Sequence, residues 1–93
     1  MTPLTISNFD SLEHWNHYQF LVRQIENEKA LLAELMESRE KYILRLHAYN
    51  GSYKGMAEIA ECMRHANKRI LQTKDLLKKL TNKYEIILRC FVK

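Results

Sequence analysis

Two pairs of side chains have the spacing of metal ligands. His14 and His17 lie three residues apart, and so do Cys62 and His65. On a helix this spacing places both members of a pair on one face, where imidazole and thiolate groups can chelate a metal. The helices derived below separate the two pairs by roughly 40 Å at the standard rise. We therefore predict neither metal nor cofactor, and interpret the histidines as partly exposed helix residues.

Cys62 and His65 also have the chemistry of a nucleophile and a base, but no third group is identified that would orient the histidine. The sequence contains no G-x-S-x-G, glycine-rich phosphate loop or H-E-x-x-H motif. We predict no catalytic residue and expect Cys62 to be a buried or half-buried structural cysteine. Cys62 and Cys90 lack C-x-x-C spacing, and no signal-peptide pattern is evident. Both observations favour an intracellular location, cytoplasmic or nuclear.

Arg23, Glu26 and Arg39 lie in a leucine-rich stretch. Over about twenty residues this pattern resembles the long first helix of the helical chorismate mutases, a family of small, all-helical, dimeric enzymes. The resemblance implies mutase activity, which we keep as a remote alternative. No convincing lysine stands at the place the family pattern expects after Arg39. A non-enzymatic function is therefore the main prediction.

Basic residues dominate the second half of the chain. Residues 1–53 carry five basic and seven acidic groups, net −2, whereas residues 54–93 carry ten and four, net +6. Six of these basic residues fall within roughly 140° of one another on a helix: Arg64, Lys68, Lys78, Lys79, Lys83 and Arg89. Such a stripe suits an acidic protein partner or phosphates, so nucleic-acid binding is the second functional prediction. Glu61, Asp75 and Glu85 dilute the stripe.

Few residues interrupt the backbone that positions these groups. The chain has one proline, Pro3, and two glycines, Gly51 and Gly55. Two uninterrupted blocks predict an all-α protein of one domain. We expect a lead-in over 1–9, a helix over 10–49, a turn over 50–55 and a helix over 56–92.

The ends of these elements carry their own signals. Ser7 with Asp10, or Asp10 with Glu13, has the spacing of a capping box before Leu12. Gly51 is a natural left-handed cap at the end of the first helix.

Apolar residues recur at helical spacing in both blocks. In the second block an apolar residue recurs every seven positions, followed three positions later by a second, uncharged series. The first series is Met56, Met63, Ile70, Leu77, Tyr84 and Phe91. The first block carries a comparable stripe, interrupted by Glu28, Lys29 and Arg39. These patterns predict a coiled-coil-like antiparallel hairpin in which the numbers of facing residues add up to about 105. The basic helix would then lie along the acidic one.

One hairpin seam leaves large apolar residues uncovered. Leaving each exposed forgoes roughly 1.5–3 kcal/mol of burial. We therefore predict that a second copy, or a helical partner, completes a four-helix bundle. A kink near Asn16 that would give three helices is an alternative. The predicted interface comprises Phe9, Trp15, Phe20, Val22, Met36, Ile43, Leu71, Leu76, Ile86, Leu88, Phe91 and Val92.

Aromatic residues gather at the end of the hairpin opposite the turn. Phe9, Trp15, Tyr18 and Phe20 fall within a short segment that the hairpin places beside Phe91. Such a cluster is typical of a recognition patch or of a packed end cap. The sequence thus predicts an interaction protein, either an adaptor, an assembly subunit or a small chaperone, that acts through helix packing.

Overall fold

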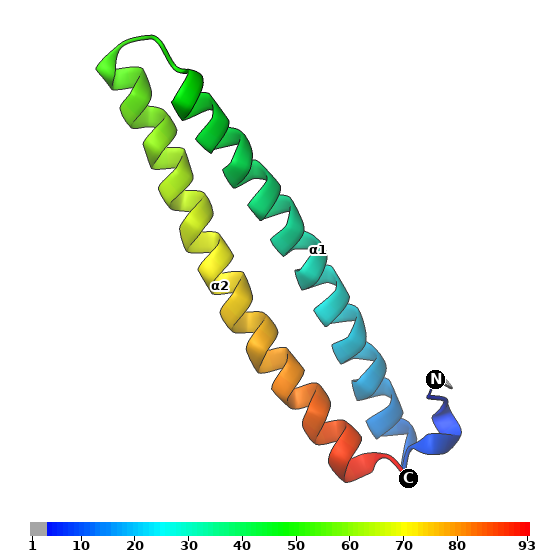
Figure 1. Cartoon of the computed structure of the whole chain (residues 1–93). Helices are drawn as coiled ribbons and strands as arrows, with labels where there is room; N and C mark the ends of the chain where they lie inside the picture. Colours follow the sequence, from blue (N-terminus) through cyan, green and yellow to red (C-terminus); the bar gives the residue numbers. More distant parts are fainter. Residues whose placement is uncertain (1–3) are drawn as a thin grey trace.

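The computed structural model describes residues 4–93 as an antiparallel hairpin of two long helices (Figure 1). Helix α1 spans Leu12–Ala48 and helix α2 spans Tyr53–Phe91; a single 3-10 turn, η1, covers Ile6–Asn8. The hairpin measures 62 × 21 × 16 Å. The all-α hairpin predicted from the sequence is confirmed, and Pro3 lies outside the described residues.

The first helix begins later than predicted and runs without a break. The Ser11 side chain accepts a hydrogen bond from the backbone N–H of His14 at 3.2 Å, so the N-cap is Ser11 and neither Ser7 nor Asp10. The helix continues through Asn16 to Ala48. The alternative of a kink that would divide it into two helices is therefore wrong.

The turn is shorter than the predicted 50–55, because α2 already begins at Tyr53. Neither glycine has a positive φ, so the prediction of a left-handed cap at Gly51 is wrong. Both glycines instead make room for the Tyr49 ring. A Cβ on Gly51 would lie 2.6 Å from Tyr49 Oη, and one on Gly55 would overlap the same atom.

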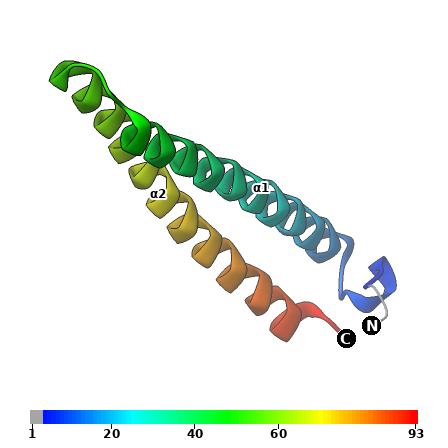
Figure 2. The same cartoon turned by 45° about the horizontal axis from the view of Figure 1, so that its top comes forward.

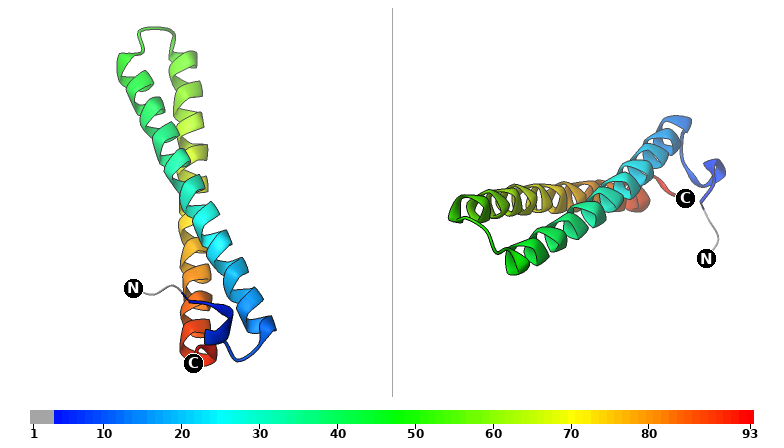
Figure 3. Two further views of the ribbon diagram at one scale, coloured as in Figure 1. Left: turned by 90° about the vertical axis from the view of Figure 1, so that its right-hand side faces the viewer. Right: turned by 90° about the horizontal axis from the view of Figure 1, so that it is seen from above.

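The predicted seam is observed in both helices. The side chains that it buries are Leu21 and Leu35 of α1, and Ala66, Ile70, Thr73, Leu80 and Ile87 of α2. His14 stacks on Phe91 with ring centroids 3.9 Å apart, and Arg39 Nη1 donates to Asn67 Oδ1 at 3.5 Å. Both pairs fit the predicted register. The two helices cross as they run along one another (Figure 3).

The lead-in that precedes α1 packs against the end of α2 (Figure 2). The backbone N–H of Asp10 donates to the carbonyl of Phe91 at 3.3 Å, and that of Lys93 donates to the carbonyl of Asn8 at 2.7 Å. Between these bonds Phe9 and Val92 form an isolated β-bridge. The open end of the hairpin is thus closed by a third segment of chain.

Candidate helix-binding surface

The predicted interface residues differ in accessibility. Phe20, Met36, Leu71, Leu76 and Ile86 are exposed. The half-buried ones are Trp15, Val22, Ile43, Leu88, Phe91 and Val92. Phe9 is only 4% exposed, so its assignment to a partner surface is wrong in the hairpin. The sequence pattern placed Phe9 in the predicted interface, but Phe9 precedes the helix and packs in the core cluster with Leu21, Leu80 and Ile87.

The open end is a packed cap rather than a free aromatic patch. The Phe9 ring lies 5.3 Å from the Trp15 ring and 4.9 Å from the Tyr18 ring, between ring centroids. Tyr18 also stacks on Tyr84 at 5.6 Å. Burial, together with the neighbouring Tyr84 hydroxyl, raises the pKa of Tyr18 above its usual 10.0. Phe20, at 58% exposed, stays outside this cap.

One side of the hairpin collects apolar side chains from both helices. Val22, Met36 and Ile43 are separated by whole heptads, so they lie along the same side of α1. Thr81 of α2 lines one groove with Val22, and Leu88 lies one heptad beyond Thr81. Asn67 lies two heptads before Thr81 and therefore on the same side of α2. Leu71 lies four residues after Asn67, so it neighbours Asn67 on that side. We call this side, defined by Val22, Met36, Ile43, Leu71 and Leu88, the apolar flank.

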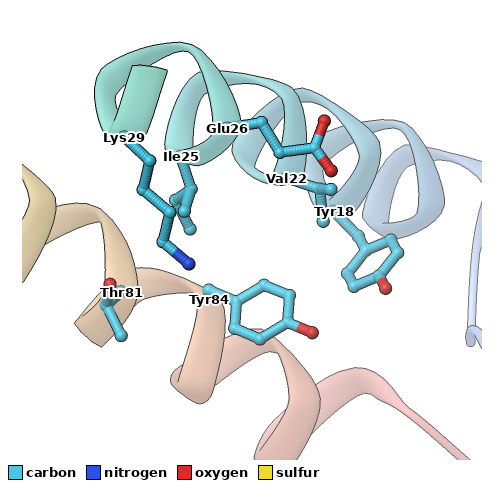
Figure 4. Close-up of a pocket in the computed structure, with 7 residues that line it drawn as sticks. All are labelled: Tyr18, Val22, Ile25, Glu26, Lys29, Thr81 and Tyr84. Carbon is cyan, nitrogen blue, oxygen red and sulfur yellow. The ribbon is translucent and has the colours of Figure 1, made fainter. Parts of the chain in front are cut away.

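A groove of about 280 Å³ runs between the helices on the apolar flank. Figure 4 shows Tyr18, Val22 and Ile25 on its α1 wall and Thr81 and Tyr84 on its α2 wall. Glu26 lies at its rim, and Lys29 extends from α1 toward α2. The lining combines aliphatic and aromatic side chains with the charged groups of Glu26 and Lys29, as in surfaces that receive an amphipathic helix.

A larger hollow of about 450 Å³ lies on α2 near the turn, and sequence reasoning missed it. Met56, Ala57, Ala60 and Met63 line it, with Arg64 at its edge. The heptad pattern placed Met56 in the seam, but Met56 is 41% exposed. Because α1 ends at Ala48, the first turn of α2 reaches beyond it and has no facing helix. The signal available in the sequence was the proximity of Met56 to the turn.

No ion pair joins the two helices within residues 4–93. The pairs Lys41–Glu37, Arg64–Glu61, His65–Glu61 and Lys79–Asp75 all lie within one helix, at exposed positions. The charge asymmetry between the helices is therefore left facing solvent. The six residues of the basic stripe are all exposed, and two of them, Arg64 and Lys79, already pair with carboxylates.

The residues considered for chemistry lie apart. His17, Cys62 and His65 are exposed, and the expectation of a buried or half-buried Cys62 is wrong. Among the described residues, no three His, Cys, Asp or Glu side chains lie close enough to hold a metal. Arg23 and Arg39 are about 24 Å apart along α1. Arg39 bonds Asn67 in the seam, whereas Arg23 faces solvent.

Comparison with known families, curated proteins and solved structures gives no match for this chain. In the part of the chain that the structure describes, neither helix has an apolar stretch long enough to cross a bilayer. The class of protein defined by the fold is an all-helical hairpin with an uncovered apolar flank.

Proposed function

We propose that this chain is a non-enzymatic assembly protein that works by packing its apolar flank against further helices and so completes a four-helix bundle. One observation carries the proposal. Leu71, on the outer edge of the apolar flank, is 67% exposed although its neighbours Ile70 and Thr73 are buried in the seam. Met36 of α1 is exposed on the same flank.

The flank runs along about half of the hairpin. Its α1 residues, from Val22 to Ile43, span roughly 32 Å at the standard rise of 1.5 Å per residue, whereas the whole hairpin is 62 Å long. Burying a side chain of the size of Leu or Met contributes roughly 1.5–3 kcal/mol. The free energy from burying several such side chains exceeds that of the charged groups at the rim, because exposed ion pairs contribute little.

Sedimentation of the wild-type chain and of two variants tests the proposal. Leu71→Glu places a charge on the apolar flank, and we expect it to shift the assembly toward the monomer. Leu44→Glu is the matched control, because Leu44 is also 67% exposed but lies on the outer face of α1. We expect Leu44→Glu to leave the assembly unchanged.

A helical partner other than a second copy is tested by affinity purification with the same two variants as baits. A protein retained by wild type and Leu44→Glu but lost by Leu71→Glu would support binding through the flank. A wild-type chain that stays monomeric at high concentration and retains no such protein would refute the proposal.

A further inference from the structure

We propose that the occupant of the apolar flank is a second copy of this chain, related to the first by a two-fold axis along the length of the hairpin. Both turns then lie at the same end of the bundle. This inference rests on the proposed function and adds the identity and orientation of the partner.

Two identical hairpins can pack flank to flank by a two-fold axis in only two ways. With the axis along the hairpin, α1 of one copy faces α2 of the other. With the axis across the hairpin, α1 faces α1 and α2 faces α2, and the turns lie at opposite ends. Neighbouring helices are antiparallel in both arrangements, so helix dipoles do not distinguish them. The charges along the flank do.

Four of the exposed charged residues on the flank lie at its outer edge on two levels, and the others are Lys29, Lys74 and Glu85. Glu26 lines the groove between the helices, and Glu40 lies two heptads further along α1. Arg64 lines the hollow near the turn, and Lys78 lies two heptads further along α2. Within residues 4–93, Glu26, Glu40 and Lys78 form no ion pair, and Arg64 pairs only with Glu61 of its own helix.

The register of the hairpin places these four residues on two levels. His14 faces Phe91 and Arg39 faces Asn67, so Glu26 lies level with Lys78 and Glu40 lies level with Arg64. With the axis along the hairpin, each glutamate meets the basic residue of the second copy at its own level. Both levels then carry opposite charges on each side of the bundle, and these four opposite-charge pairs outnumber the two contacts of Lys29 with Lys74 that the arrangement also creates.

With the axis across the hairpin, the same residues oppose one another. Glu26 and Glu40 are equally distant from Ala33, and Arg64 and Lys78 are equally distant from Leu71. Ala33 and Leu71 lie nearly level, so an axis centred there brings Glu26 to Glu40 of the second copy and Arg64 to its Lys78. Like charges then meet at every edge, which favours the first arrangement.

The whole helices reinforce this preference. Helix α1 carries six acidic and five basic residues, whereas α2 carries nine basic and four acidic ones. With the axis along the hairpin, each basic helix α2 faces a helix α1 of the other copy. With the axis across the hairpin, the two basic α2 helices face each other. The apolar residues of the flank pack in either arrangement, so the orientation is decided by charge.

A distance measurement between the two turns tests the orientation. Asn50→Cys is labelled with a nitroxide in a Cys62→Ser, Cys90→Ser background, because both native thiols are exposed. We expect an interspin distance below about 30 Å in the dimer, since neighbouring helix axes are about 10 Å apart. A distance near the 62 Å length of the hairpin would overturn the inference and leave the proposed function standing.

A charge reversal gives an independent readout of opposite sign for the two arrangements. Glu26→Lys should weaken the dimer several-fold at low salt, because the introduced lysine then meets Lys78 of the second copy at both symmetric contacts. In the opposite arrangement it would meet Glu40 and strengthen the dimer, which would overturn the inference. Glu34→Lys carries the same charge change on the outer side of α1 and should have little effect. A monomeric wild-type chain would contradict the inference whatever these variants do.

Discussion

The two ends of the hairpin differ in how completely they are packed. At the open end Phe9 and Leu21 are 4% and 2% exposed, and the lead-in and the end of α2 are tied by backbone hydrogen bonds. At the turn, Met56 is 41% and Tyr53 is 85% exposed. From Met36 to His65 no side chain is buried.

The difference shows that the covalent connection does not determine which end is better packed. The open end has no turn, but a third segment covers the seam there. The turn joins the helices but brings no covering segment, so the seam side chains near it are half-buried or, at Met56, exposed. The region that lacks cover is also the region that a partner can cover.

The largest expected effect is the loss of the covering segment. Phe9→Ala removes a buried aromatic ring that packs on Trp15 and Tyr18, and we expect it to lower the free energy of unfolding by about 3 kcal/mol. Chemical denaturation at a fixed protein concentration measures this. Phe20→Ala, at an exposed aromatic of the same end, should cost less than about 1 kcal/mol. Equal losses would mean that the buried Phe9 ring stabilises the hairpin no more than an exposed ring at the same end.

The same substitution at both ends of the α1 seam measures the contrast directly. Leu21→Ala should lower the free energy of unfolding by about 3 kcal/mol, because Leu21 is almost fully buried. Leu46→Ala, in the half-buried seam near the turn, should cost about half as much. Denaturation curves of both variants at one concentration provide the comparison. A Leu46 loss as large as that at Leu21 would mean that the turn end is covered in solution.

The helix caps should contribute equally at the two ends. Ser11 accepts from the backbone of His14 and Ser52 from that of Gly55, at 3.2 and 3.3 Å. Replacing either serine by alanine should lower the free energy of unfolding by about 1 kcal/mol, and replacing it by glycine should lower it by only about a few tenths of a kcal/mol. Thermal unfolding followed by circular dichroism suffices for both. A loss above about 2 kcal/mol at one serine would show that it supports more than a helix end.

The smallest expected effect is a pH dependence confined to the packed end. The pKa of Tyr18 is raised in the folded chain, so its contribution to stability is complete below pH 10 and is lost as the pH rises through the folded value. Denaturation at pH 9 and above pH 10 should show a smaller alkaline loss for Tyr18→Phe than for the wild type. Tyr53→Phe, at an exposed tyrosine, should follow the wild type. If all three proteins lost the same stability at alkaline pH, the raised pKa of Tyr18 would not be the cause of that loss.

The sequence could predict the parts of the fold that depend on periodicity. Heptad spacing located the seam through Ile70 and Leu80, and the position of the turn determined that His14 would face Phe91. It could not place Phe9, because helical phase does not describe a residue in a non-helical lead-in. Nor could it show why the turn contains glycines, since the reason is the Tyr49 ring above them. For the candidate surface, it identified Leu71 and Met36 but not Met56, whose exposure depends on where α1 ends.

The β-bridge between Phe9 and Val92 has a consequence for how the chain folds. It joins residues that are far apart in the sequence, so it closes a long loop, whereas contacts near the turn close short ones. We expect the helices to zip from the loosely packed turn toward the tightly packed end, which forms last. Variants near the turn should then mainly slow folding, and Phe9→Ala should mainly speed unfolding, in stopped-flow measurements. Comparable φ-values at both ends would contradict this order. The final folding step forms the most buried contacts of the molecule. These contacts lie at the open end, where the ends of the two helices would otherwise fray.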